Sequence, residues 1–135
     1  MTRPEDEGWQ PDVHGGFIAG FATLWRRQEP GGLAFAMRVE QRHLDRAGTM
    51  SSGALMVFAD HAVGNAAMPV FGVAQVTIQL QVAPVLAVAP GDFLEGRGEL
   101  IGHDGDIAHL RGRFCVGNRV VASADGRWKR VRPLS

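Results

Sequence analysis

The sequence predicts an α+β domain in which a curved antiparallel sheet wraps around a single buried helix. Residues 51–68 are apolar on nearly every side, which is typical of a helix buried on all faces. One extended run precedes this segment and four follow it, with the alternating polarity of strands that have one buried face. In one of these runs, residues 93–102, the face expected to point inward carries three glycines, so a bulky element should pack there: Gly96, Gly98 and Gly102.

The N-terminal part divides into two segments. Residues 1–12 are polar, contain two prolines and show no hydrophobic period, so we expect a flexible arm, followed by one domain over residues 13–135. From residue 14 to residue 25, apolar side chains recur near helical spacing, which predicts a short amphipathic helix that covers an edge of the core. The segment Pro30-Gly31-Gly32 would end that helix.

The strands follow from alternation and from turn residues. Residues 35–40 alternate apolar and polar side chains and form the first predicted strand. The later strands are expected at residues 76–82, 93–102, 107–116 and 119–131, with Asp104-Gly105 and Gly117-Asn118 as the hairpin turns between the last three. In the final strand, the side chains expected to face the core are Val120, Ala122, Ala124 and Trp128.

Composition narrows the function classes. The 135 residues include 14 basic and 14 acidic side chains, and a net charge of zero argues against a general nucleic-acid-binding protein. A single cysteine excludes an internal disulfide and a multi-cysteine zinc site, and it fits a reducing compartment. The acidic N-terminus lacks a basic region followed by an apolar run, and no stretch approaches the ~20 apolar residues of a membrane span. We therefore expect a cytoplasmic protein with no membrane partner.

The order of strand, buried helix and four strands is that of the hotdog fold, and three segments point to one family. The run HLDRAGTMSSGALMVFADHAVG (residues 43–64), the run VTIQLQV (residues 76–82) and Pro90-Gly91-Asp92 resemble the hotdog acyl-CoA thioesterases of the phenylacetate-degradation (PaaI-like) type. The resemblance extends over residues 33–131. It implies hydrolysis of an acyl-CoA with a small, medium-chain or aryl acyl group to the free acid and coenzyme A. It also implies a homodimer or homotetramer with active sites at the subunit interface.

Asp60 is the first candidate catalytic residue. It is a carboxylate within an otherwise apolar helix, on a face that also carries small residues such as Gly53 and Gly64, which leaves room for a ligand. From the residues alone, a buried aspartate that caps a backbone group of a neighbouring loop is an equal alternative. The resemblance favours catalysis, because the matching acid in related enzymes is the general base or the nucleophile that attacks the thioester.

Two residues at the start of the helix form the predicted oxyanion site, and a third precedes them. Free N–H groups at a helix N-terminus stabilise the negative charge that develops on a thioester carbonyl. The resemblance assigns this role to the N–H groups of Ser52 and Gly53. Ser51 stands where the family has a histidine that positions the thioester, so this chain has Ser-Ser-Gly in place of His-Gly-Gly. The two serines are equally suited to capping the helix N-terminus.

Each remaining candidate residue has an alternative interpretation. Asp45 stands where relatives use Asn or Gln to orient the water or the carboxylate, and a solvated turn residue is the alternative. Gln75 matches a polar residue that relatives contribute from the partner subunit, and a surface position at a strand start is the alternative. The last candidates form a basic patch suited to the phosphates of coenzyme A, and a solvated strand edge is the alternative: Arg127, Lys129, Arg130 and Arg132.

Metal and cofactor chemistry is not expected. His103 and His109 flank a turn without a third well-spaced ligand, so no metal site is predicted, and thioester hydrolysis requires no cofactor beyond the coenzyme A of the substrate. The leading alternative function is a hotdog protein that binds acyl-CoA without hydrolysing it, which the change from His-Gly-Gly would favour. A hotdog dehydratase ranks lower, because the adjacent residues Asp60 and His61 point about 100° apart on a helix.

Overall fold

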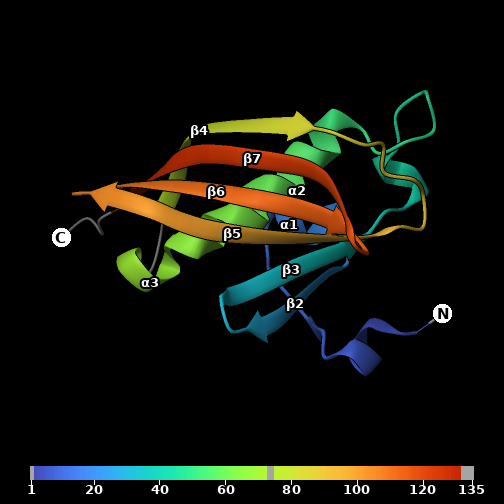
Figure 1. The fold of residues 1–135 in the computed structure, drawn as a ribbon, viewed down its shortest axis with the longest axis horizontal. Helices are drawn as coiled ribbons and strands as arrows, with labels where there is room; N and C mark the ends of the chain where they lie inside the picture. The colour runs from blue at the N-terminus through green and yellow to red at the C-terminus, as the bar shows by residue number, and fades with distance from the viewer. Residues whose placement is uncertain (1, 73–74, 132–135) are drawn as a thin grey trace.

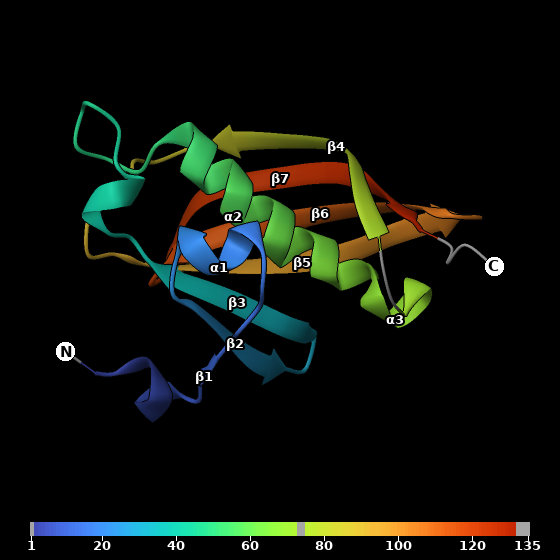
Figure 2. The same ribbon diagram turned by 180° about the vertical axis from the view of Figure 1, so that it is seen from behind.

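The computed structural model describes residues 2–72 and 75–131, which form a curved antiparallel sheet with a long helix lying across one face (Figure 1, Figure 2). The helices are α1 (Phe17–Phe21), α2 (Ser52–Gly64) and α3 (Met68–Phe71), and 3₁₀ turns lie at Pro4–Glu7, Gln41–His43 and Asn65–Ala67. The strands are β1 (Gln10–Pro11), β2 (Leu24–Glu29), β3 (Gly32–Arg38), β4 (Gln75–Pro84), β5 (Phe93–Asp104), β6 (Ile107–Val116) and β7 (Arg119–Arg130). Their order across the sheet is β1-β2-β3-β5-β6-β7-β4, and every neighbouring pair is antiparallel. This arrangement confirms the predicted α+β architecture.

Glycines in the sheet allow α2 to approach closely. A Cβ atom on Gly98 would lie 3.0 Å from Cα of Val63, and a Cβ atom on Gly112 would overlap the side chain of the same valine. On Gly96, a Cβ atom would lie 2.8 Å from the ring of Phe114. The glycine-rich face therefore receives a bulky element, as the sequence predicts, and that element is the central helix.

The apolar segment that contains α2 differs from its prediction in extent. The sequence predicts one helix over residues 51–68, whereas α2 ends at Gly64 and a 3₁₀ turn and α3 carry the segment on to Phe71. Ser52–Phe71 has the length and apolar composition of a membrane span, with a mean hydropathy of 1.3. The expectation that no segment is long and apolar enough to span a membrane is therefore wrong. Much of its apolar surface packs on the sheet, because the buried side chains of α2 include Leu55, Phe58, Ala59 and Val63.

A β-hairpin begins at the last two residues of the predicted N-terminal helix. The helix predicted from residue 14 to residue 25 is confirmed only as the five residues of α1, and its last two positions belong to strand β2 (Leu24–Glu29). β2 pairs with β3 along its whole length. Pro30-Gly31 is therefore a hairpin turn and not a helix end. Strand pairing decides the conformation here, because the helical periodicity of so short a segment is a weak signal.

The end of the predicted flexible arm is packed against the sheet. Trp9 is 2% exposed and packs with Ala34 and Ala36, on the face of β3 that points away from α2. The guanidinium of Arg27 lies over the Trp9 ring, 4.3 Å from its centroid. The expectation of a loose arm therefore fails for Trp9 to Asp12, because one large aromatic ring gives this polar segment enough apolar surface to bury.

A β-bulge changes which residues of β7 face the core. The register of the β6–β7 pair shifts between Phe114 and Cys115. Val120, predicted to face inward, is 41% exposed, and its neighbour Val121 is fully buried in its place. Farther along the strand the prediction is confirmed, because the buried residues are Ala122, Ala124 and Trp128.

Candidate functional site

Asp60 lies on α2 opposite strand β4, with its side chain exposed to solvent. The hydroxyl of Thr77, on β4, donates a short hydrogen bond to Oδ1 of Asp60. The alternative of a buried aspartate that caps a loop backbone is therefore wrong. Among the described residues no hydrogen bond engages Oδ2 of Asp60, so this oxygen is free to act on a water molecule or an acyl group.

Thr77 is the functional candidate that the sequence analysis does not identify. Alternating polarity marks it only as part of the polar face of a strand. Its contact with Asp60 depends on where β4 passes α2 and on a register shift in the β4–β7 pair between Thr77 and Gln79. The only sequence signal is a β-branched hydroxyl residue near a strand start, and such residues are common in strands without any function.

The start of α2 provides the predicted N–H donors. Ser51 is the N-cap, and its hydroxyl oxygen accepts a hydrogen bond from the N–H of Ala54 at 3.1 Å, which confirms a capping role for this serine. Ser52 and Gly53 follow in the first turn and are exposed. N–H groups in the first turn have no partner within their own helix, so those of Ser52 and Gly53 can stabilise an anion.

Asp60 and these N–H groups are far apart on the same helix. Asp60 follows Ser52 by eight positions along α2. With a rise of about 1.5 Å per residue, they are separated by about 12 Å along the helix axis. A carbonyl group that is attacked by the carboxylate and held by the donors must lie about 3 Å from both. One chain therefore does not bring the predicted catalytic groups together by itself.

Asp45 belongs to a turn that precedes α2. Its Oδ1 accepts hydrogen bonds from the N–H groups of Ala47 at 2.9 Å and Thr49 at 3.3 Å. Its own N–H donates to the carbonyl of Thr49 at 2.8 Å, and the residue is exposed. These contacts favour the interpretation of Asp45 as a solvated turn residue. They also place it before the N-terminal end of α2, away from Asp60 of the same chain.

Gln75 connects the start of β4 to the end of α2. Its side-chain amide donates a short hydrogen bond to the carbonyl of Gly64. The amide oxygen of Gln75 is buried and has no hydrogen-bond partner among the described residues. The alternative of a plain surface residue is therefore wrong, because the side chain is engaged within its own chain. A role toward a partner subunit stays a prediction.

The predicted basic patch is divided between two faces of β7. Arg127 and Lys129 are exposed on one face. Arg130 points to the other face, where its guanidinium forms an ion pair with Asp106 at 2.8 Å. Arg132 lies outside the described residues. Nε of Arg127 donates a hydrogen bond to Oε1 of Gln79 at 3.0 Å, which leaves its terminal nitrogens and the Lys129 ammonium for a phosphate group, whereas Arg130 is engaged elsewhere.

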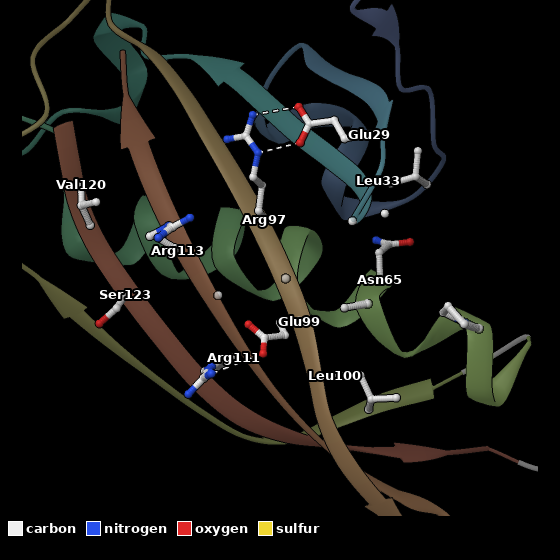
Figure 3. A pocket seen from close by; sticks show the side chains of 16 residues that line it. Glu29, Leu33, Asn65, Arg97, Glu99, Leu100, Arg111, Arg113, Val120 and Ser123 are labelled. Atoms are coloured by element: carbon white, nitrogen blue, oxygen red, sulfur yellow. Dashed lines mark hydrogen bonds and ion pairs between the residues drawn. The ribbon is translucent and has the colours of Figure 1, made fainter. Parts of the chain in front are cut away.

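An open cavity of about 810 Å³ is lined by residues that include parts of β2, β5, β6 and β7 and of the turn after α2 (Figure 3). Two ion pairs lie along it: Arg97 with Glu29, joined by hydrogen bonds of 2.7 and 2.9 Å, and Arg111 with Glu99 at 3.3 Å. The hydrogen bonds from Arg97 lower the pKa of Glu29 from 4.5 to about 2, against the opposing effect of burial. None of the predicted site residues lines this cavity.

Replacing Glu29 with Gln should change how stability depends on pH. Because the pKa of Glu29 is about 2 in the folded protein and 4.5 in the reference state, the carboxylate stabilises the fold above that reference value, and this contribution is lost as the pH falls towards 2. The difference in free energy of unfolding between wild type and Glu29→Gln should therefore shrink as the pH falls, as measured by urea unfolding. Glu99→Gln breaks an exposed pair and should show a small difference throughout. A difference for Glu29→Gln that does not change with pH would contradict the prediction.

No protein-family model matches the sequence, and no curated protein matches it. Three similar solved structures cover most of the chain. A variant of the phenylacetic acid degradation protein PaaI from Thermus thermophilus gives a TM-score of 0.75 at 23% identity and covers 85% of this chain and 98% of that one. A hypothetical thioesterase protein from Streptococcus pneumoniae, solved with coenzyme A, gives 0.73 at 17% identity, with 93% and 99% covered. Zebra fish thioesterase superfamily member 2 gives 0.73 at 18% identity, with 88% of each chain covered. The likeness shows that the chain has the hotdog fold.

Proposed function

We propose that this protein hydrolyses the thioester bond of an acyl-CoA and releases the free acid and coenzyme A. The observation that carries the proposal is the exposed carboxylate of Asp60, held by the hydroxyl of Thr77 on an otherwise apolar helix. Two proteins of the same fold are named as thioesterases, and one of them was solved with coenzyme A. The acyl group belongs to the small, medium-chain or aryl class that the sequence resemblance implies.

The reaction needs a base or nucleophile and an oxyanion site. As a base, Asp60 takes a proton from water while the water oxygen forms a bond to the thioester carbon. As a nucleophile, the carboxylate forms that bond itself, and water then hydrolyses the resulting anhydride. In both routes the carbon–sulfur bond breaks, and coenzyme A leaves as a thiolate that takes up a proton. The N–H groups of Ser52 and Gly53 stabilise the negative carbonyl oxygen.

A second copy of the chain completes the proposed active site. Ser52 and Gly53 lie about 12 Å from Asp60 along α2, so one carbonyl does not reach both groups within one chain. In the described part of the chain, β4 ends the sheet and pairs only with β7, and it exposes Val76 at 50% and Ile78 at 47%. An antiparallel copy at this edge would bring the helix start of one chain towards Asp60 of the other. A homodimer is therefore the smallest proposed active assembly, and a homotetramer is compatible with it.

Arg127 and Lys129 are the groups that we assign to the phosphates of coenzyme A. Both are exposed on β7, and Arg127 lies opposite Gln79 in the pairing with β4, near the proposed subunit edge. Guanidinium and ammonium groups bind phosphate oxygens with charge-assisted hydrogen bonds. Arg130 is left out of the assignment because its ion pair with Asp106 already satisfies its charge.

Thr77→Val should lower kcat by about 10-fold and leave KM nearly unchanged. Valine keeps the shape of threonine but removes the hydroxyl that fixes the Asp60 carboxylate, and small misplacement of a reacting group costs about 10- to 100-fold in rate. Steady-state kinetics of thiol release measure the effect. Thr77→Ser keeps the hydroxyl and is expected to retain most of the activity. If Thr77→Val keeps the wild-type activity and Thr77→Ser loses it, Thr77 acts through packing of its methyl group and not through the hydrogen bond.

Thiol release from a panel of short-chain, medium-chain, long-chain and aryl acyl-CoAs tests the proposed function. We expect release of coenzyme A with a clear preference for one class, from a protein whose mass by light scattering corresponds to at least two chains. Saturable binding of an acyl-CoA without thiol release from any member would instead support the alternative, a binding protein without hydrolysis. A change in enoyl-CoA absorbance without thiol release would support a dehydratase.

A further inference from the structure

Three side chains from distant parts of the chain meet beside the central helix. Asp12 follows β1, His14 lies two positions farther on, and His61 is on α2. Nε2 of His14 lies 2.8 Å from Oδ1 of Asp12, and Nε2 of His61 lies 2.8 Å from Oδ2 of Asp12. The three potential ligand atoms lie within 4.8 Å of one another. Sequence patterns do not reveal this cluster, because 49 positions separate Asp12 from His61.

The cluster is buried on one side and open on the other. The side chains of Asp12 and His61 are 3% and 11% exposed, and that of His14 is 40% exposed. The N–H of Asp12 donates to the carbonyl of Leu24 at 2.9 Å, and Phe35 packs edge-on against the His61 ring. Burial alone would raise the pKa of Asp12, but the hydrogen bond from His61, with a further contribution from His14, outweighs burial and lowers it. The cluster therefore places a carboxylate between two imidazoles.

We propose that Asp12, His14 and His61 form a binding site for a divalent transition metal of the zinc class. Imidazole nitrogens and a carboxylate oxygen are preferred zinc ligands, whereas magnesium and calcium require oxygen ligands. With bonds of about 2.0–2.2 Å in a tetrahedral site, ligand atoms lie about 3.3 Å apart. Because the present separations extend from 2.8 Å to no more than 4.8 Å, changes of up to about 1.5 Å in these separations accommodate the ion. The exposed side at His14 leaves the fourth position to water.

The role of this site is to fasten the N-terminal segment to the central helix. The chain between β1 and α1 carries two of the ligands, and α1 lies over α2 (Figure 2). A bound metal would therefore join two segments that otherwise meet through hydrogen bonds and packing. The site is separate from the proposed catalytic carboxylate, because His61 and Asp60 are neighbours whose side chains point about 100° apart around the helix. Metal binding should therefore change stability whether or not the protein hydrolyses thioesters.

Zinc titration of tag-free protein that has been treated with a chelator tests the proposal. We expect one zinc ion per chain in competition with a chromophoric chelator, and a melting temperature raised by about 5–10 °C at a zinc concentration of roughly 100 times Kd. Cobalt in place of zinc should give the visible absorption of a tetrahedral site. Magnesium should give no shift in melting temperature, because the site offers too few oxygen ligands.

Substitutions of the proposed ligands test whether these residues bind the metal. His14→Gln alters an exposed side chain and keeps a hydrogen-bond donor, and Asp12→Asn keeps the shape of the carboxylate. Both should lower the zinc affinity by about 100-fold or more while the fold, checked by circular dichroism, is retained. His103→Gln, at the exposed end of β5, should bind zinc as the wild type does. Absence of zinc binding by the wild type, or equal binding by His14→Gln, would overturn the proposal.

Discussion

Asp60→Asn is expected to lower kcat for thioester hydrolysis by at least about 100-fold, the range over which a positioned acid or base acts. The amide neither accepts a proton at neutral pH nor attacks a carbonyl. It keeps the size of the carboxylate and an oxygen that can accept the hydrogen bond from Thr77, so the geometry around α2 should be preserved. Thiol release at saturating acyl-CoA, with both proteins at equal folded concentration, measures the loss.

A control substitution and a stability measurement distinguish the loss of the Asp60 carboxylate from a general effect on the protein. Asp125→Asn changes an exposed aspartate on β7 and should leave kcat and KM as in the wild type. Because Asp60 is exposed, its substitution should change the urea midpoint very little. If the wild type releases thiol and Asp60→Asn releases it at the same rate, the carboxylate is not the base or nucleophile, and the thioesterase proposal would need another base or nucleophile.

Gly126→Ala is expected to destabilise the fold by about 2 kcal/mol, within the usual cost of overpacking. A Cβ atom at this position in β7 would overlap the backbone carbonyl oxygen of Gln79 and would lie 2.9 Å from the ring of Trp128. A backbone carbonyl in a paired strand does not rotate away as a flexible side chain does. The added methyl group must therefore push β4 away from β7, and urea unfolding should show a lower midpoint.

The matched control for this substitution is Gly102→Ala. Gly102 is also a strand glycine, but a Cβ atom there would meet nothing within 4 Å, so its replacement should be nearly neutral. Because β4 also carries Thr77, a displaced β4 should weaken the hydrogen bond to Asp60 and reduce kcat for thiol release as well. Equal stability of the two variants would show that the β4–β7 pair tolerates a side chain at Gly126.

The central part of the fold is predictable because its local patterns are strong. Two features indicate a helix packed on a sheet: the apolar segment that contains Phe58, and the glycine-rich face of β5. The structure confirms this arrangement. The N-terminal part is not predictable in the same way. The helical period of residues 14–25 extends into Leu24 and Trp25, where strand pairing overrides it, and the burial of Trp9 depends on a surface that only the folded sheet provides.

The candidate site, like the fold, includes some features that the sequence predicts and others that it does not. Asp60 can be selected from the sequence as a carboxylate in an apolar helix, and the family resemblance points to it and to Ser52 and Gly53 as site residues. The partner of Asp60 cannot, because Thr77 reaches it only through the path of β4. The ion pair of Arg130 is not predictable for a related reason: alternation along β7 turns this residue away from Arg127, and Asp106, in the turn between β5 and β6, pairs with it.

Strand β4 also has a consequence for how the protein avoids aggregation. Its ten residues, QVTIQLQVAP, carry no charge, and a proline stands only at its end. Edge strands in soluble proteins are usually protected by charged side chains, bulges or proline, because an uncharged edge is a template for adding strands from other chains. A newly made chain, before its edge is covered, would expose such a template. Rapid self-association at β4 would then protect the protein during folding, because a covered edge no longer offers unpaired N–H and C=O groups to other chains.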